Sequence, residues 1–358
     1  MRLVEVLKLG RHTWKLIGVF LLLALSTIIL ACTPSHPQST FDTLGPVAET
    51  QANLFYWIFW SGLVVLLAVG GVLAYIVIKY RRRLNDKDPE QIHGHTRLEI
   101  AWTILPVIIV VFIAVPTIFA IFETSNSPHS PEDGGVVIDA IGHQWWFEFK
   151  YPNHDVITAN EIHIPVGQPI NINLKSVDVI HSFWIPKLAG KVDMIPNNNN
   201  TMWIQADEPG IYIGTCAEFC GISHAHMGFR VIAEPRDEFD AWLIQQAEPS
   251  VTSVDPLAIE GEELFMSTKA GCRGCHTIGG TKARGVTGPD LTHFASRTTF
   301  AGSILENTQS NLRAWLEDPD HIKPGNIMAK DGVVFNDPDR ALNESQVSAL
   351  MAYLRVLE

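Results

Sequence analysis

The sequence predicts a multi-domain membrane protein in which a two-helix transmembrane hairpin precedes an all-β sandwich and a small all-α domain. Apolar residues make up 47% of the chain, and the longest apolar blocks lie near the N-terminus. Apolar and polar residues alternate in the middle of the chain, whereas the C-terminal part shows helical spacing. A length of 358 residues leaves room for two folded domains and further segments.

The first 31 residues predict a signal peptide of the lipoprotein type. A basic segment, residues 2–15, precedes an apolar run, residues 16–30, and Cys32 follows one residue later. This order resembles the bacterial lipoprotein box, in which the cysteine receives lipid and becomes the mature N-terminus. The alternative is an uncleaved or differently cleaved anchor in which Cys32 is an ordinary thiol. Residues 32–53 are expected to form an exported linker.

Two apolar stretches, residues 54–80 and 97–123, predict transmembrane helices. Each can cross a hydrocarbon core of about 30 Å at about 1.5 Å per residue. Basic residues gather in and beside the loop of residues 81–96, namely Lys79, Arg81, Arg82, Arg83, Lys87 and Arg97. The positive-inside rule places this loop in the cytoplasm, so both ends of the hairpin and all that follows lie outside.

Glu99 stands in the first turn of the second predicted helix. An acidic side chain there stabilises the helix dipole, and this is the ordinary interpretation of the residue alone. A carboxyl group at the edge of the membrane is also a candidate proton carrier.

Residues 134–246 predict an antiparallel β-sandwich. Period-two stretches such as 161–166 and 170–174 are separated by turns rich in Gly, Pro and Asn. Near the end of this region Cys216, Cys220, His224 and Met227 follow one another closely, and His181 stands upstream.

These residue types favour copper over other metals. Thiolate and thioether sulfurs together with imidazoles bind copper, and two neighbouring cysteines can bridge two copper ions. A Cys216–Cys220 disulfide is an alternative, but it would leave His181, His224 and Met227 unexplained. Zinc is another alternative, although its usual ligands do not include methionine.

The spacing Cys-X-Glu-X-Cys-X-X-X-His-X-X-Met resembles the binuclear copper A signature of cytochrome c oxidase subunit II, and the resemblance covers residues from about 50 to 235. It implies a cupredoxin-like sandwich. The implied copper ligands are His181, Cys216, Cys220, His224, Met227 and the main-chain carbonyl of Glu218. The Glu218 side chain would face a magnesium ion shared with subunit I. His226 lies outside the pattern.

Two further positions match this family. The segment 142–147 resembles the aromatic run beside the copper site, in which Trp145 would be the electron-entry residue. The segment departs from the commoner Trp-Tyr-Trp version, and a tryptophan pair on a strand is by itself ordinary core. Glu99, just before Trp102, matches the acidic residue at the mouth of a proton channel that leads into subunit I.

A linker of residues 247–256 leads to the last domain, residues 257–358, which carries the motif Cys272-Arg-Gly-Cys275-His276. Cys-X-X-Cys-His attaches haem c: the cysteines form thioethers and the histidine binds iron. A chance match and a thioredoxin-like redox pair are the alternatives.

Helical patterns surround the motif, at residues 258–269, 311–317 and 345–357, and Asn343 with Gln346 predicts an N-terminal cap for the last helix. The domain resembles class I cytochromes c. This resemblance implies Met328 as the sixth iron ligand and a role for the Pro289 carbonyl in supporting the ring of His276. Met266 and Met351 are expected in the core.

The combined parts resemble the caa-type oxidase subunit II with a fused class I cytochrome c domain. The resemblance implies two copper ions, one covalent haem c and magnesium at the subunit I interface. It also implies electron transfer from a cytochrome c or a quinol-oxidising complex to subunit I, where oxygen is reduced to water with proton pumping. Subunits I and III and membrane lipid are the implied partners, in a bacterial inner membrane with both soluble domains outside.

Three other functions remain open. A nitrous oxide reductase-like copper A protein would use the same ligands, a quinol oxidase subunit would share the fold without them, and an exported lipoprotein would use the cysteines for disulfides. The net charge of −12 argues against nucleic-acid binding, which requires clustered basic residues.

Overall fold

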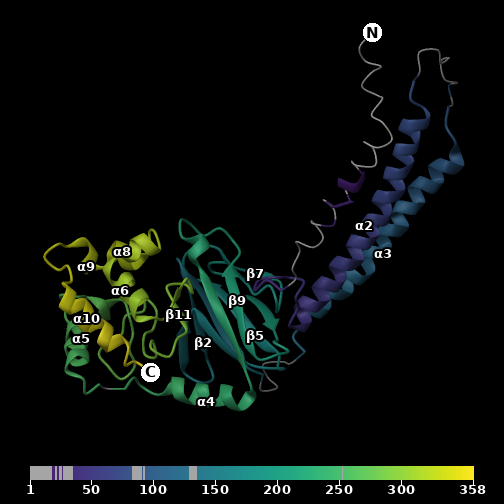
Figure 1. The fold of residues 1–358 in the computed structure, drawn as a ribbon. Coiled ribbons are helices and arrows are strands. Elements are labelled where there is room, and N and C mark those ends of the chain that lie inside the picture. Colours follow the sequence, from purple (N-terminus) through teal and green to yellow (C-terminus); the bar gives the residue numbers. More distant parts are fainter. Residues whose placement is uncertain are drawn as a thin grey trace, which may run out of the picture.

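The computed structural model describes residues 18–20, 22–23, 26, 35–82, 91, 93–128, 135–251 and 253–358. The expected lipidation at Cys32, most of the signal segment and most of the loop 81–96 lie outside these residues. Figure 1 shows three parts in chain order: a long helical hairpin, a β-sandwich and a helical domain on the side of the sandwich away from the hairpin. The predicted fold class is confirmed.

The hairpin consists of α2 (Pro46–Lys79) and α3 (Thr96–Ser125), which run side by side. Among the described residues, these two helices are long and apolar enough to cross a membrane. Helix α2 begins well before its apolar run because Val47, Ala48 and Ala52 are buried at its first turns, where the amide of Ala48 donates to the carbonyl of Leu188. The hairpin is therefore joined to the sandwich by packing as well as by sequence.

Two five-stranded sheets form the sandwich, in the orders β3-β2-β1-β5-β8 and β4-β10-β9-β6-β7. The strands are β1 (Val137–His143), β2 (Trp146–Tyr151), β3 (Val156–Ala159), β4 (Glu161–Pro165), β5 (Ile170–Ser176), β6 (His181–Trp184), β7 (Lys191–Met194), β8 (Asn200–Ile204), β9 (Gly210–Cys216) and β10 (Gly228–Glu234). Alternate residues of β1 and β10 are buried, as a two-layer sandwich requires. The rings of Phe147, Phe183 and Phe229 meet in the core.

The prediction of an antiparallel sandwich holds for most strand pairs but not for all. Strands β1 and β5 are parallel, and so are β4 and β10. Alternation of apolar residues fixes which side chains face the core but carries no information on strand direction. Helix α4 (Arg236–Ala247), which the alternation also did not predict, follows β10 and buries Phe239 and Leu243 against the sandwich.

The C-terminal domain is helical. Its helices are α5 (Pro256–Met266), α6 (Gln309–Glu317), α7 (Pro319–Ile322), α8 (Ile327–Asp331), α9 (Val333–Asn336) and α10 (Glu344–Leu354), with a short hairpin of β11 (Thr299–Phe300) and β12 (Leu305–Glu306). The predicted cap at α10 is confirmed, because Asn343 and Gln346 form a reciprocal capping box. Helix α10 packs on α5.

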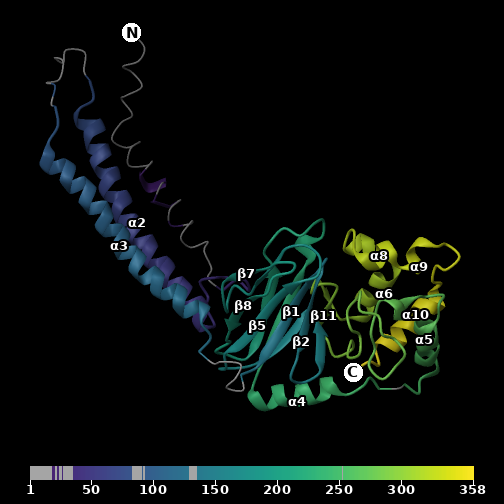
Figure 2. The same ribbon diagram turned by 180° about the vertical axis from the view of Figure 1, so that it is seen from behind.

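The helical domain lies directly against the sandwich, and both views place β11 at this boundary (Figures 1 and 2). The amide of Gly228 donates to the carbonyl of Gly302 at 2.9 Å, and the hydroxyl of Ser223 donates to the carbonyl of Pro324 at 2.6 Å. The loops that bear the candidate sites of the two domains therefore meet at this boundary.

Candidate metal centre and haem cavity

The sulfur and imidazole groups predicted to bind copper are brought together by the sheet and one loop. Cys216 ends β9, and the chain then folds back so that the Cys216 amide donates to the carbonyl of Met227 at 2.9 Å. His181 begins β6, which pairs with β9 through Phe183 and Cys216. The register of these two strands places His181 beside the start of the loop.

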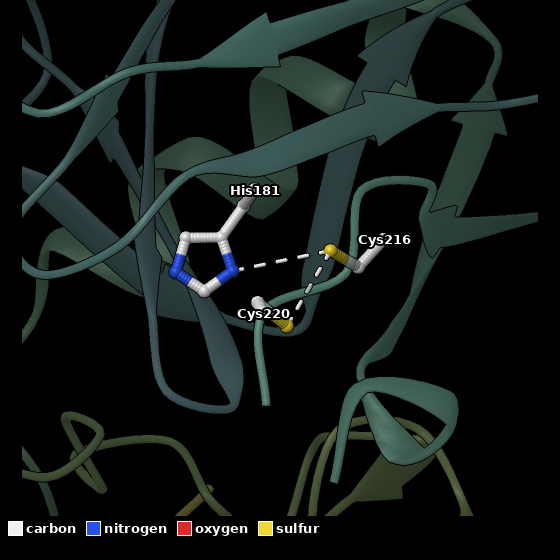
Figure 3. A group of neighbouring side chains, drawn as sticks. All are labelled: His181, Cys216 and Cys220. Atoms are coloured by element: carbon white, nitrogen blue, oxygen red, sulfur yellow. Dashed lines mark hydrogen bonds between the residues drawn. The ribbon is translucent and has the colours of Figure 1, made fainter. Parts of the chain in front are cut away.

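The sulfur of Cys216 faces both His181 and the sulfur of Cys220 (Figure 3). Its sulfur lies 3.9 Å from His181 Nδ1, 3.8 Å from the Cys220 sulfur and 3.3 Å from the carbonyl oxygen of Glu218. A disulfide would need an S–S distance of about 2.05 Å. Both cysteines are free and buried, so the disulfide alternative does not describe this loop.

Cys220 has a second imidazole and a thioether beside it. Its sulfur lies 3.6 Å from His224 Nδ1 and 3.8 Å from Met227 Sδ. Each cysteine sulfur thus has one histidine nitrogen close to it. Two buried sulfurs, two imidazoles and a thioether form the soft donor set that suits copper, so the residues fit the predicted ion pair.

Asp178 orients His181. The Nε2 atom of His181 donates to the Asp178 carboxylate at 2.8 Å, which directs Nδ1 toward the sulfur of Cys216. Burial lowers the pKa of His181, but the bonds with Asp178 and Cys216 outweigh it and raise this pKa. The amides of Gln144 and Val179 also donate to Asp178, both at 2.6 Å.

The two thiols are electrostatically coupled. The hydrogen bond between the sulfurs lowers the pKa of Cys216, and the same bond raises the pKa of Cys220. Metal binding to such a pair requires deprotonated sulfurs and is therefore linked to proton release.

Glu218 and His226, the other polar residues of this loop, point elsewhere. The side chain of Glu218 is exposed, whereas its carbonyl faces Cys216. His226 is half-buried, and its Nδ1 has no hydrogen-bond partner. Phe219 is 75% exposed and forms an apolar tip on the same loop.

The Cys-X-X-Cys-His motif lines a cavity of about 400 Å³, and Met328 also lies on its wall. His276 Nδ1 donates to the carbonyl of Pro289 at 2.7 Å, as the resemblance to class I cytochromes c implied. This bond leaves Nε2 free for a metal. Burial raises the pKa of Cys272 to about 12, which keeps this thiol protonated in the haem-free chain.

Gly288 leaves the space that the His276 ring occupies. A Cβ at Gly288 would lie 2.6 Å from Cε1 of His276, so a side chain there would displace the ring. The rest of the wall is largely apolar and includes Phe265, Phe294 and Leu350. An apolar cavity with two thiols, an oriented imidazole and a thioether fits a covalently attached haem.

Residues of the sandwich complete the wall of this cavity, which no motif predicted. Trp145 and Trp146 lie on it together with two cations of the helical domain, Arg297 and Lys323. Burial lowers the pKa of both cations.

Trp145 contacts both sites. The residue is 8% exposed and lines the cavity, and its Nε1 donates to the carbonyl of Cys220 at 3.0 Å. The side-chain amide of Gln144 donates to the same carbonyl at 2.7 Å. One residue therefore joins the wall of the cavity to the copper loop.

Glu99 lies in the first turn of α3 and is exposed, and its carboxylate accepts the amide of His95 at 3.2 Å. This is a capping contact, as the ordinary interpretation of the sequence predicts.

Three family models match the chain. "Cytochrome C oxidase subunit II, transmembrane domain" matches residues 35–120, the periplasmic domain of the same family matches residues 155–234, and "Cytochrome c" matches residues 258–358. A cytochrome c oxidase subunit 2 of Alkalihalophilus pseudofirmus is 40% identical over 96% of this chain and 98% of its own length. The chain belongs to the cytochrome c oxidase subunit 2 family.

Other relatives of this subunit 2 chain carry two names. A cytochrome c oxidase subunit 2 of Bacillus sp. (strain PS3) is 36% identical over 98% of this chain and 99% of its own length. A quinol oxidase subunit 2 of Bacillus anthracis is 34% identical over 69% of this chain and 85% of its own length. The matched families make this a membrane protein with a periplasmic domain, and they imply copper A in the sandwich and haem in the C-terminal domain.

Proposed function

We propose that this chain is the electron-entry subunit of a proton-pumping cytochrome c oxidase. In this proposal it conducts electrons from an external donor to subunit I, where oxygen is reduced to water. The bound haem c and copper pair supply the one-electron carriers. The chain itself holds these groups and positions the residues that lie between them.

The observation that carries this proposal is the position of Trp145. The residue lines the haem cavity, and its Nε1 donates to the carbonyl of the proposed copper ligand Cys220. The path from the cavity to the copper loop therefore needs no mobile carrier, and we assign electron entry into the copper centre to Trp145.

The placement of the donor atoms supports the ligand roles in this proposal. We assign the two thioether bonds to Cys272 and Cys275 and the two iron-ligand positions to His276 and Met328, which all line the cavity. We assign two copper ions to the cluster formed by His181, Cys216, Cys220, His224, Met227 and the Glu218 carbonyl. The exposed Glu218 carboxylate is free to bind magnesium at a subunit I interface.

In this proposal the external donor passes its electrons to the cytochrome domain. Trp145 is 8% exposed and is covered by the segment around Gly325, where a Cβ would lie 3.5 Å from the indole. A soluble cytochrome c or a quinol-oxidising complex therefore has no direct approach to Trp145. Fusion replaces its docking at the copper site by an intramolecular contact.

The membrane roles remain proposals that rest on sequence. They place the chain in a bacterial inner membrane with both soluble domains outside, lipid on Cys32, and subunits I and III as partners. Glu99 is proposed at the entry of a proton channel. Replacement of Glu99 by Gln keeps a capping acceptor but removes the titratable group, so proton uptake should slow while reduction of the copper centre stays unchanged.

The similarity to cytochrome c oxidase subunits over almost the whole chain does not favour the nitrous oxide reductase alternative. The quinol oxidase relatives support a second candidate, since they share the fold over part of the chain. The clustered sulfur and imidazole donors and the haem cavity favour the cytochrome c oxidase function over it.

Metal and haem analysis of the purified full chain tests the proposal. We expect two coppers and one covalent haem per chain, and an EPR hyperfine pattern of one electron shared equally by two copper nuclei. A chain that binds haem but no copper would support the quinol-linked candidate instead. A chain that holds zinc, or neither group, would exclude both.

A further inference from the structure

Lys323 connects the two soluble domains at the position of Trp145. It lies between α7 and α8 and is 3% exposed. Its Nζ donates to the carbonyl of Trp145 at 2.5 Å and to the carbonyl of Ala301 at 2.9 Å. Trp145 belongs to the turn between β1 and β2 of the sandwich, and Ala301 belongs to the β11–β12 hairpin of the cytochrome domain. One ammonium group therefore joins the main chains of both domains.

The burial of this ammonium is unfavourable for the fold. Within the described residues, no carboxylate forms an ion pair with Lys323, and burial lowers its pKa to about 7. An apolar side chain of similar size would avoid this desolvation cost. Because burying the ammonium costs free energy of folding, we infer that its contacts serve a role other than stabilising the fold.

The surroundings fit the ammonium closely. Gly302 has a φ of +81°, and a Cβ there would lie 2.5 Å from Lys323 Nζ. Gly325, two residues after Lys323, lies against the ring of Trp145, since a Cβ there would be at the ordinary contact distance of 3.5 Å from Cη2. The main chain of Trp145 is held by Lys323, its ring packs on Gly325, and its Nε1 is held by the Cys220 carbonyl.

The chain segment that begins at Lys323 also lines the haem cavity. Lys323 and Met328 both line the cavity, and the side chain of Asn326 between them donates to the carbonyls of Pro319 and Lys323. Asn326 also caps α8 by accepting the amide of Ala329. The segment 323–328 is thus held by several hydrogen bonds, and it connects the proposed iron ligand Met328 to the contact with the proposed electron-entry residue Trp145.

We propose that Lys323 is a positioning residue for electron transfer within the chain. Its ammonium holds the Trp145 main chain against the cytochrome domain, so that the residue lines the haem cavity while its indole reaches the Cys220 carbonyl. One electron leaves the reduced haem and arrives at the oxidised copper pair, and Lys323 takes no part in its chemistry. This inference rests on the proposed function.

The test is the rate of haem-to-copper electron transfer in the assembled oxidase after flash reduction of the haem. Lys323→Met should slow this step by about tenfold or more, the factor expected when one charge-assisted hydrogen bond is lost from a docked state. Lys323→Arg keeps the charge and the donors, so it should restore much of the rate. The matched control is Lys330→Met, which removes an exposed lysine of the neighbouring helix α8 and should transfer at the wild-type rate.

A second measurement reports on position and does not depend on turnover. Amide hydrogen exchange in residues 145–147 and 299–302 should rise in Lys323→Met, while the haem absorption and copper EPR spectra stay unchanged. If Lys323→Met does not accumulate, Lys323→Ala provides the same comparison.

The outcomes separate this inference from the proposed function. Wild-type transfer and exchange in the Met or Ala variant would overturn the role of Lys323 alone, provided that the wild type conducts. Absence of transfer in a wild type loaded with both groups would overturn the proposed function itself.

Discussion

The indole nitrogen of Trp145 donates a hydrogen bond to the main-chain carbonyl of Cys220 at 3.0 Å. This bond joins a residue on the haem-cavity wall to the peptide unit of a proposed copper ligand. The haem cavity and the copper loop thus share one residue.

Replacement of Trp145 by Phe should slow haem-to-copper electron transfer, because Phe keeps an aromatic ring but has no donor for the Cys220 carbonyl. We expect about a tenfold loss in rate if the bond fixes the ring in its productive position. Flash-induced absorption changes of the haem measure the rate. Trp242→Phe, in α4 and stacked on His163, is the control and should leave it unchanged. Equal rates in both variants would mean that the path does not use this bond.

Met328→Leu should lower the haem reduction potential and alter the reduced absorption spectrum, because Leu keeps the apolar volume but has no sulfur for the iron. Met351→Leu is the matched control, since Met351 is buried in the core of the same domain. Its spectrum and potential should match those of the wild type. Spectroelectrochemical titration makes the comparison, and an unchanged Met328→Leu potential would remove Met328 from the ligand set.

Glu161→Ala should weaken the contact between the domains. The buried carboxylate accepts the amides of Thr298 and Thr299 at 2.9 and 2.8 Å, and the Thr298 hydroxyl as well. Loss of this acceptor leaves buried donors unpaired, at a cost of about 3 kcal/mol. Chemical denaturation of the full chain measures the loss.

Glu306→Ala is the control for Glu161→Ala, because Glu306 lies exposed on β12 of the same hairpin. Its effect should stay within about 0.5 kcal/mol. Similar stabilities for the two variants would show that Glu161 does not hold the domains together.

Asp139→Asn should reveal a pH-dependent stabilisation of the parallel β1–β5 pair. Burial raises the pKa of Asp139, but bonds from Lys175 and Asn173, both 2.7 Å long, outweigh it and lower this pKa below 3.8. A carboxyl group of this kind stabilises the fold above its unfolded pKa and loses the effect as pH falls through its folded pKa.

The wild type should therefore exceed Asp139→Asn in free energy of unfolding by about 1 kcal/mol near pH 7. The difference should shrink as pH falls below the ordinary aspartate pKa of about 3.9 and vanish once pH is below the lowered folded pKa. Denaturant titrations of both chains at several pH values measure it, with Asp193→Asn, exposed on β7, as the control. A difference that is constant with pH would contradict the assigned cause.

Local patterns in the sequence predicted the elements and much of each site. Short-range motifs place Cys216, Cys220, His224 and Met227 in one loop, and the Cys-X-X-Cys-His motif specifies its own chemistry. The contact between the domains could not be predicted in this way. Lys323 contacts Trp145 although 178 positions separate them in the sequence. No sequence motif contains both residues, so no motif could predict their contact.

Strand direction was also beyond the sequence pattern. Burial alternates in the same way in parallel and antiparallel strands, so the parallel pairing of β4 and β10 follows only from the complete topology. Helix α4 was missed because the alternation that identified the sandwich ends at β10.

The proposed copper donors come from separate parts of the sandwich, since His181 begins β6 and the others lie in the loop between β9 and β10. Bound copper would therefore act as a cross-link that the unfolded chain cannot form. Because a ligand that binds only the native state adds to its stability, copper supply would determine how long this domain survives unfolding and proteolysis. Metal delivery would then control the lifetime of the subunit as well as its conductivity.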